Sequence, residues 1–181
     1  VTHYNPIPHA LEERAILDQK CGLWLESCGG FGIILTSIPW REAWKYGERA
    51  FRYCQHDLGH ALGALRYSCN LNGWKMTLIS QISEKTLEHF LGFDQLRWVD
   101  GEAEHVDCLC WVESKHYDSK AISEWFSLQQ NLTYQHSPNR LSPEHANWEI
   151  IDKVQKASRP NDSIALQTSS YLNPGENAFT S

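Results

Sequence analysis

The sequence predicts an α+β domain in which a mixed, mainly antiparallel β-sheet is flanked by helices. Short apolar runs, which are typical of strands, alternate along the chain with segments of helical spacing. One helix is marked clearly, because its apolar residues form a single stripe from Phe51 to Cys69. The chain has 181 residues, 41% of them hydrophobic, which suffices for one sizeable core and is too little for a second complete domain.

The first expected elements are the end of a strand at residues 1–4 and a helix at residues 9–17. Two prolines lie between them, and proline interrupts regular structure because it lacks a backbone N–H. Residues 9–17 have the apolar spacing of a helix. After a glycine pair, the apolar run at residues 31–38 predicts a buried strand, and Pro39 ends it.

A helical pattern then dominates residues 41–70. Its apolar stripe consists of Phe51, Cys54, Leu58, Leu62, Leu65 and Cys69. The opposite face carries Gly59 and Gly63, and a glycine inside a helix costs about 1 kcal/mol relative to alanine. Two such glycines predict that another backbone or a ligand approaches this face closely.

The later elements alternate between strands and helices. A short strand is expected at residues 76–79, a helix at residues 84–91 that Gly92 ends, and a buried strand at residues 106–112. A further helix is expected at residues 120–130.

The last helix has a clear start signal. Ser142 is the expected N-cap and Pro143 the first helical position before a helix at residues 144–157. Residues 159–163 then read as a linker into a polar tail.

Charge and hydropathy exclude several classes of partner. A net charge of -6 and a pI near 5.8 provide no basic footprint for nucleic acid or for an anionic membrane. No run of 18 apolar residues and no signal-peptide pattern occur, so we expect a soluble, cytoplasmic protein. The start at Val1 and the polar end predict that the chain was cut from a longer one.

The six cysteines favour buried, reduced thiols. They are Cys21, Cys28, Cys54, Cys69, Cys108 and Cys110. No Cys-x-x-Cys pair is present to support tetrahedral zinc ligation, and free cysteine packs as a small hydrophobic residue. Cys108 and Cys110 alternate along an apolar run, which predicts that both point to the same face of a strand.

Two polar clusters could carry chemistry. His56 and His60 are spaced i and i+4 on one helical face, which can chelate zinc, with Asp57 between them as a base. Aspartate replaces the glutamate of the metalloprotease motif, however, and no third ligand follows nearby, so packing and hydrogen bonding are the alternative roles.

The second cluster is Lys45 and Tyr46, followed closely by Arg49, Arg52 and Tyr53. An amine and a phenol near several guanidinium groups could have lowered pKa values that suit proton transfer beside a redox cofactor. The alternative from spacing alone is a solvated basic face with an amphipathic tyrosine.

A family resemblance favours the catalytic interpretation. The segments that carry it are Trp44-Lys45-Tyr46-Gly47-Glu48-Arg49-Ala50-Phe51-Arg52-Tyr53, Asp57-Leu58-Gly59-His60-Ala61 and Leu71-Asn72-Gly73-Trp74. They resemble the SagB/ThcOx-type branch of the nitroreductase superfamily, FMN-dependent enzymes of which the best understood oxidise azolines in modified peptides. The resemblance implies a nitroreductase-like fold and a catalytic role for Lys45 and Tyr46.

The resemblance covers about residues 1–113 and implies a division of the chain. Residues 1–115 would form a partial nitroreductase-like domain that lacks its N-terminal part, and residues 116–158 a helical extension and connector. Residues 159–181 would be a polar linker and tail. The connector resembles that of longer members with a second nitroreductase-like half, which implies a homodimer or an intramolecular pseudo-dimer.

The family pattern also implies where FMN binds. The phosphate-binding Arg/Ser-rich segment is not present in this sequence, so the site in this chain would be incomplete. Ser80 and Gln81, after the strand at residues 76–79, would approach the isoalloxazine edge, although better-known members often carry an acidic residue and glycine there. Asn139-Arg140 offers a guanidinium for a phosphate, and an exposed arginine in a loop is the alternative.

The expected function is therefore flavin-dependent oxidation and reduction. Lys45 or Tyr46 would move the proton that accompanies hydride exchange, and Arg49 or Arg52 would bind an anionic group. The alternatives are a degenerate, non-catalytic half that serves dimerisation or peptide binding, and a zinc hydrolase using His56 and His60. Peptide azolines, nitroaromatics, quinones and small thiol-derived metabolites all suit flavin chemistry as substrates.

Overall fold

The computed structural model describes residues 1–17, 19–99, 101–113, 119–128, 132–135, 138, 140–144 and 146–159. The expected tail beyond residue 159, the end of the helix expected at residues 120–130, and Asn139 lie outside this part of the chain.

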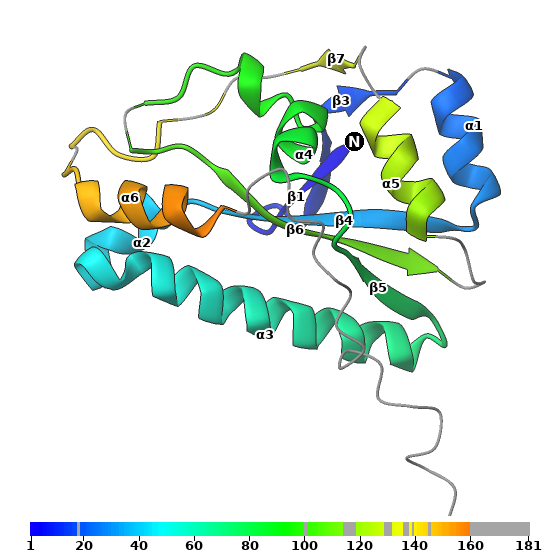
Figure 1. The fold of residues 1–181 in the computed structure, drawn as a ribbon, viewed down its shortest axis with the longest axis horizontal. Coiled ribbons are helices and arrows are strands. Elements are labelled where there is room, and N and C mark those ends of the chain that lie inside the picture. The colour runs from blue at the N-terminus through cyan, green and yellow to red at the C-terminus, as the bar shows by residue number, and fades with distance from the viewer. Residues whose placement is uncertain are drawn as a thin grey trace, which may run out of the picture.

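The described chain is a mixture of helices and antiparallel strands (Figure 1). The helices are α1 (Gln19–Ser27), α2 (Pro39–Tyr46), α3 (Ala50–Leu71), α4 (Glu84–Phe90), α5 (Ser119–Leu128) and α6 (Glu149–Ser158), with short 3-10 turns at Gly47–Arg49 and Phe93–Gln95. The strands are β1 (Thr2–Asn5), β2 (Ala10–Glu13), β3 (Ala15–Ile16), β4 (Gly30–Ser37), β5 (Lys75–Ile79), β6 (His105–Glu113) and β7 (Thr133–Tyr134). Every described strand pairing is antiparallel, so the coarse α+β prediction is confirmed.

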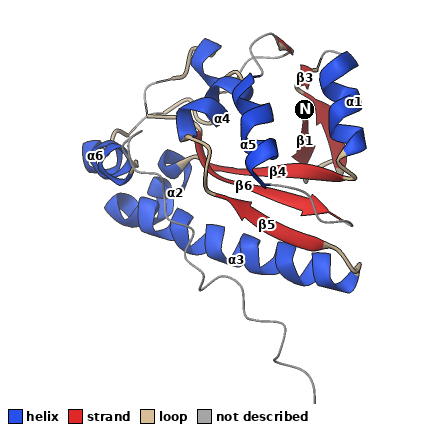
Figure 2. Ribbon diagram, turned by 45° about the vertical axis from the view of Figure 1, so that its right-hand side comes forward, coloured by secondary structure: helices blue, strands red, loops and turns tan. Residues whose placement is uncertain are grey.

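The main sheet has three strands in the order β4-β6-β5. The α3 helix runs along one face of this sheet, and α4 and α5 cover the other (Figures 1 and 2). The larger core lies on the α4 and α5 side. It includes Leu87 and Phe90 of α4, Ile122, Trp125 and Phe126 of α5, and Val106, Leu109 and Trp111 of β6. Because α5 shares this core, residues beyond 115 help to cover the sheet.

The α3 helix has 22 residues and confirms the long amphipathic helix expected from the apolar stripe. Cys54 and Cys69 are buried at its two ends, and the leucines between them are half-buried. The expected strands at residues 76–79 and 106–112 and the helix at residues 84–91 are also confirmed, with Gly92 in the left-handed conformation that ends α4. At residues 31–38 a strand forms, but β4 is half-buried, with Phe31 46% exposed.

The helix predicted at residues 9–17 is wrong. This segment forms β2 and β3, and β2 pairs with β1 through a turn that contains both prolines. Side chains fix the hairpin, because Glu12 accepts hydrogen bonds from Asn5 Nδ2 at 2.7 Å and from Arg14 Nη2 at 2.7 Å. Leu11 is 71% exposed, so the apolar spacing that suggested a helix does not mark a buried stripe.

The start predicted for the last helix is also wrong, because α6 begins at Glu149 rather than at residue 144. The Arg140 guanidinium donates to the carbonyl oxygens of Ser142 and Pro143, both at 2.8 Å, and this holds a non-helical loop. The Ser142 hydroxyl accepts from the Glu144 N–H at 3.2 Å, two residues ahead, which is a serine turn rather than a helix cap.

Candidate functional site

The corner between α2 and α3 positions the Lys45-Tyr46 pair. Pro39 starts α2, and Trp40 and Ala43 are buried, so the helix is fixed by its apolar side. Lys45 and Tyr46 are its last two residues, and Gly47 then turns the chain with φ 55°. This φ favours glycine, and a Cβ there would lie 3.4 Å from the Trp148 ring. The pair therefore lies at a sharp, packed corner.

Aromatic rings extend from this corner along the first turns of α3. The Tyr46 and Tyr53 rings stack with centroids 3.8 Å apart and an interplanar angle of 15°. Tyr53 in turn meets the His56 ring edge-on at 6.4 Å. Lys45 Nζ lies 5.6 Å from the centroid of the Tyr46 ring, which is within the range of a cation–π contact. The half-buried Tyr46 is thus fixed in orientation beside an exposed amine.

Two arginines complete the donor set at the corner. Arg49 and Arg52 are exposed, and Arg52 Nε donates to His56 Nε2 at 3.3 Å. Guanidinium and ammonium groups bind phosphate, and stacked phenols offer flat faces and an acidic hydrogen. The chemistry of Lys45, Tyr46, Arg49 and Arg52 therefore suits an anionic aromatic cofactor such as FMN.

The other predicted cofactor residues lie on different elements. Ser80 and Gln81 follow the last residue of β5, half-buried and exposed respectively, in the loop that leads to α4. Arg140 is exposed, and its Nε and Nη2 already donate to carbonyls of its own loop. Lys45, Tyr46 and Arg49 are thus neighbours at the α2–α3 corner, whereas Arg140 lies in a loop that is also bound to Glu102 through the Leu141 N–H.

The glycine face of α3 is not covered by the described chain. An added Cβ at Gly59 or Gly63 would find nothing within 4 Å. Tyr67 and Leu71, further along the helix, are 76% and 89% exposed. The close approach expected from the two glycines therefore does not come from the described part of this chain.

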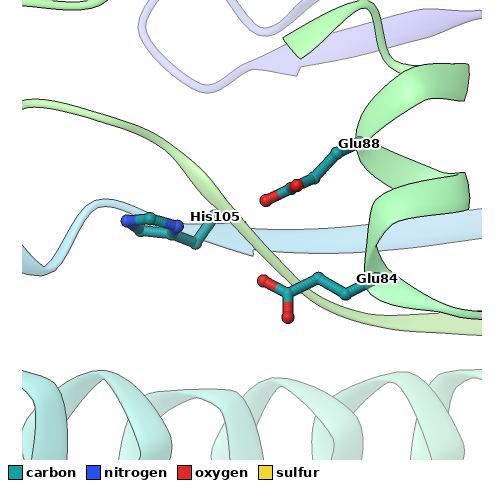
Figure 3. A group of neighbouring side chains, drawn as sticks. All are labelled: Glu84, Glu88 and His105. Atoms are coloured by element: carbon teal, nitrogen blue, oxygen red, sulfur yellow. The ribbon is translucent and has the colours of Figure 1, made fainter. Parts of the chain in front are cut away.

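The zinc alternative receives little support from the positions of the two histidines. His60 is 86% exposed, with Nδ1 3.9 Å from Asp57 Oδ1, and the Nε2 atom of His56 accepts from Arg52. Within the described residues, the set of three side chains with metal-ligand spacing is instead Glu84, Glu88 and His105 (Figure 3). These three residues were not singled out by the sequence analysis.

A second polar group that sequence reasoning missed lies between α3 and the sheet. The β4–β6 register shifts so that Leu35 pairs with Cys108 and Thr36 with Val106, which leaves Asp107 as the extra residue of a bulge. Asp107 Oδ1 accepts from Ser37 Oγ at 3.3 Å and from Gln55 Nε2 at 3.5 Å. Burial raises the pKa of Asp107 despite these bonds. The sequence signal for this polar group was a single acidic residue, Asp107, next to the apolar run of β6.

Thiols lie beside this carboxyl group. All six cysteines are free, and Cys54, on α3, has its pKa raised to about 11 by burial and by the negative charges of Glu42, Asp107 and Asp57. The thiols of Cys108 and Cys110 hydrogen-bond to each other, as their shared face of β6 allows. A thiol with so high a pKa is protonated at neutral pH, so Cys54 is a structural rather than a nucleophilic residue.

Searches of protein-family models, curated proteins and solved structures find no match for this chain. None of the helices in the described residues is long and apolar enough to cross a membrane. Function is therefore inferred from motifs and geometry.

Proposed function

We propose that this chain is part of an FMN-dependent oxidoreductase of the nitroreductase superfamily. The observation that carries the proposal is the corner at the start of α3. There, Lys45 and the stacked Tyr46 and Tyr53 gather beside two exposed arginines, on the segment whose sequence resembles the SagB/ThcOx-type motif. From this corner, α3 runs along one face of the antiparallel sheet (Figure 1).

Bound FMN would supply the hydride acceptor for substrate oxidation. The residues of this chain would bind and orient it and would move a proton. Arg49 and Arg52 have exposed guanidinium groups suited to an anionic group, and the Tyr46 hydroxyl or the Lys45 amine would donate or accept the proton that accompanies each transfer. The stack on Tyr53 would fix the Tyr46 ring, so that its hydroxyl needs little reorganisation.

The uncovered face of α3 supports a second part of the proposal. A second copy, or a second nitroreductase-like half, would pack on the face that carries Gly59 and Gly63, and FMN would bind between the two. Glycines permit close approach of two backbones. Residues from the partner would then supply phosphate contacts that Arg140, engaged with its own loop, does not offer in this structure.

A non-catalytic dimerisation or peptide-binding half is the second candidate. The observation that favours it is the same engagement of Arg140, because two nitrogen atoms of the predicted phosphate-binding guanidinium donate to its own loop. In that case α3 would still receive a partner, but no flavin would bind.

The deciding experiment expresses the chain within its complete open reading frame and records the flavin absorption of the purified protein. We expect the visible absorption bands of bound oxidised flavin, and their loss on reduction by a substrate or by dithionite. Lys45→Ala and Tyr46→Phe should retain the flavin and slow substrate oxidation by about 10²–10⁴-fold, the usual contribution of a positioned acid or base.

Lys75→Ala and Tyr4→Phe are the matched controls, because both residues are exposed and lie on other elements. Neither control should change the rate. A colourless protein that takes up no added FMN would overturn the cofactor assignment and favour the non-catalytic half. If flavin binds but the Lys45 and Tyr46 variants turn over like the controls, only the catalytic assignment fails.

A further inference from the structure

Two elements, α4 and β6, bring three metal-ligand side chains to one point away from the α2–α3 corner. Glu84 and Glu88 are four residues apart and so lie on one face of α4. His105 is the first residue of β6. One ligand atom from each of the three lies within 4.8 Å of the others, and Figure 3 shows the two carboxylates and the imidazole arranged around a common space.

The chain places its own cation at this point. Arg159, at the C-terminal end of α6, directs Nη2 to Glu84 Oε1 at 3.1 Å, to Glu88 Oε1 at 3.0 Å and to His105 Nδ1 at 2.9 Å. The side chains of Glu84 and Glu88 are only 17% and 19% exposed. A positive charge is therefore needed here, because two carboxylates brought together out of water repel each other.

A guanidinium is nevertheless a poor occupant of this position. Nη2 carries two hydrogens but faces three acceptors, and the site does not use the paired fork through which arginine usually binds carboxylates. Glu84 Oε1 is fully buried and makes no hydrogen bond of acceptable geometry, in spite of its 3.1 Å approach to Nη2. Arg159 Nε is likewise buried without a hydrogen-bond partner. A spherical cation could contact all three acceptors at once.

The charges around the cluster favour a cation with more than one positive charge. Asp107 of β6 and Glu88 place negative charges near Glu84, and Arg159 places a single positive charge there. Asp152 of α6 adds a further negative charge close enough to act on His105. The short distance between Arg159 Nη2 and His105 Nδ1 places this ring nitrogen as an acceptor, with its lone pair directed to the centre of the cluster, as a metal ligand requires.

We propose that Glu84, Glu88 and His105 form a divalent transition-metal site, which the Arg159 guanidinium occupies in this structure. A metal ion such as Mn²⁺ or Zn²⁺ replaces the guanidinium when Arg159 moves out of the site. Two carboxylates and one imidazole are a common donor set for such ions. The ligand atoms would each move inward by about 1 Å, because metal–ligand bonds are near 2.1 Å, and the long Glu side chains permit this. The proposal is independent of the flavin chemistry.

The test measures Mn²⁺ binding at pH 7 by electron paramagnetic resonance of the free ion. Mn²⁺ is chosen because oxygen and nitrogen ligands suit it better than the six free thiols do. Arg159→Gln removes the charge and leaves a shorter polar side chain, and it should bind one Mn²⁺ at least tenfold more tightly than the wild-type chain. Arg159→Lys keeps the charge and should bind no more tightly than wild type.

Further substitutions in the Arg159→Gln background locate the site. Glu88→Gln and His105→Gln should each weaken Mn²⁺ binding at least tenfold, whereas His60→Gln, at an exposed histidine on α3, should change nothing. If Arg159→Gln fails to fold, Mn²⁺ should restore its fold, and should not do so once His105→Gln is added. The proposal is overturned if Arg159→Gln binds Mn²⁺ no better than wild type, if binding survives both ligand substitutions, or if the unfolded variant is not rescued.

Discussion

Alanine substitution at Gly59 and Gly63 should stabilise the isolated chain. Both glycines lie inside the 22-residue α3 helix, where alanine is favoured over glycine by about 1 kcal/mol per position. No described atom lies within 4 Å of either new Cβ, so no steric cost offsets this gain. The double variant should therefore gain about 2 kcal/mol in the free energy of unfolding.

The assay is guanidinium unfolding followed by circular dichroism, at a protein concentration low enough to keep the chain monomeric. Ala64, exposed on the same helix, provides the matched control, because Ala64→Gly should lose about 1 kcal/mol. Sedimentation of the same variants tests the partner face. If a second copy packs against Gly59 and Gly63, the two methyl groups should weaken self-association while they stabilise the monomer.

The two readouts separate the possible errors. A double variant that is less stable as a monomer would refute the reasoning, because some part of the chain would then lie against the glycines. A stabilised variant with unchanged self-association would place the dimer contact on another surface. That result would remove the α3 face from the proposed flavin interface, and it would leave the helix-propensity argument intact.

Two further predictions concern the α4 region. Gly92→Ala should lower the free energy of unfolding by about 2–4 kcal/mol, because φ is 75° and the new Cβ would lie 2.6 Å from the Tyr134 ring. The control is Gly73→Ala, with φ 67° and nothing within 4 Å of the new Cβ, which should lower it by only about 1 kcal/mol. Equal losses in thermal or chemical unfolding would contradict the Tyr134 contact. Burial and Arg159 lower the pKa of His105 from 6.5 to about 4 in the folded chain. As the pH decreases, the unfolded chain therefore takes up the proton first, and the free energy of unfolding should fall by about 2 kcal/mol between these two pKa values. The raised pKa of Glu84 changes stability in the opposite direction, so the quantity to measure is the difference in the free energy of unfolding between wild type and His105→Gln. If this difference is the same at pH 7 and pH 4, the assignment to His105 is wrong.

The elements that sequence patterns predicted well are those with strong local signals. The α3 helix carries six apolar residues at spacings of three and four, and tertiary packing of such a stripe reinforces the helix that the spacing favours. The β6 strand is a long apolar run, and its central position between β4 and β5 buries both of its faces. In these cases local preference and tertiary packing favour the same conformation.

The N-terminal hairpin shows where a local pattern fails. Residues 9–17 are too short for helical spacing to decide between helix and strand. The outcome depends on β1, which pairs with β2, and on β7, which pairs with β3 from more than a hundred residues away. Similarly, the serine and proline that suggested the start of α6 are held in a loop by Arg140. Side-chain contacts of this kind have no periodic signature.

The two candidate sites also differ in how far the sequence alone could predict them. Lys45, Tyr46 and Arg49 are neighbours in sequence, so a motif can mark them, although the corner that holds them also packs against Trp148. The proposed metal site joins Arg159 to Glu88 across 71 residues of sequence and to His105 across 54. No spacing rule connects such positions, and each residue alone resembles an ordinary surface charge. The site is distinguished by a mismatch, because Arg159 Nη2 has two hydrogens but faces three acceptors. This mismatch can be recognised only once the fold places α4, β6 and the end of α6 around the same point.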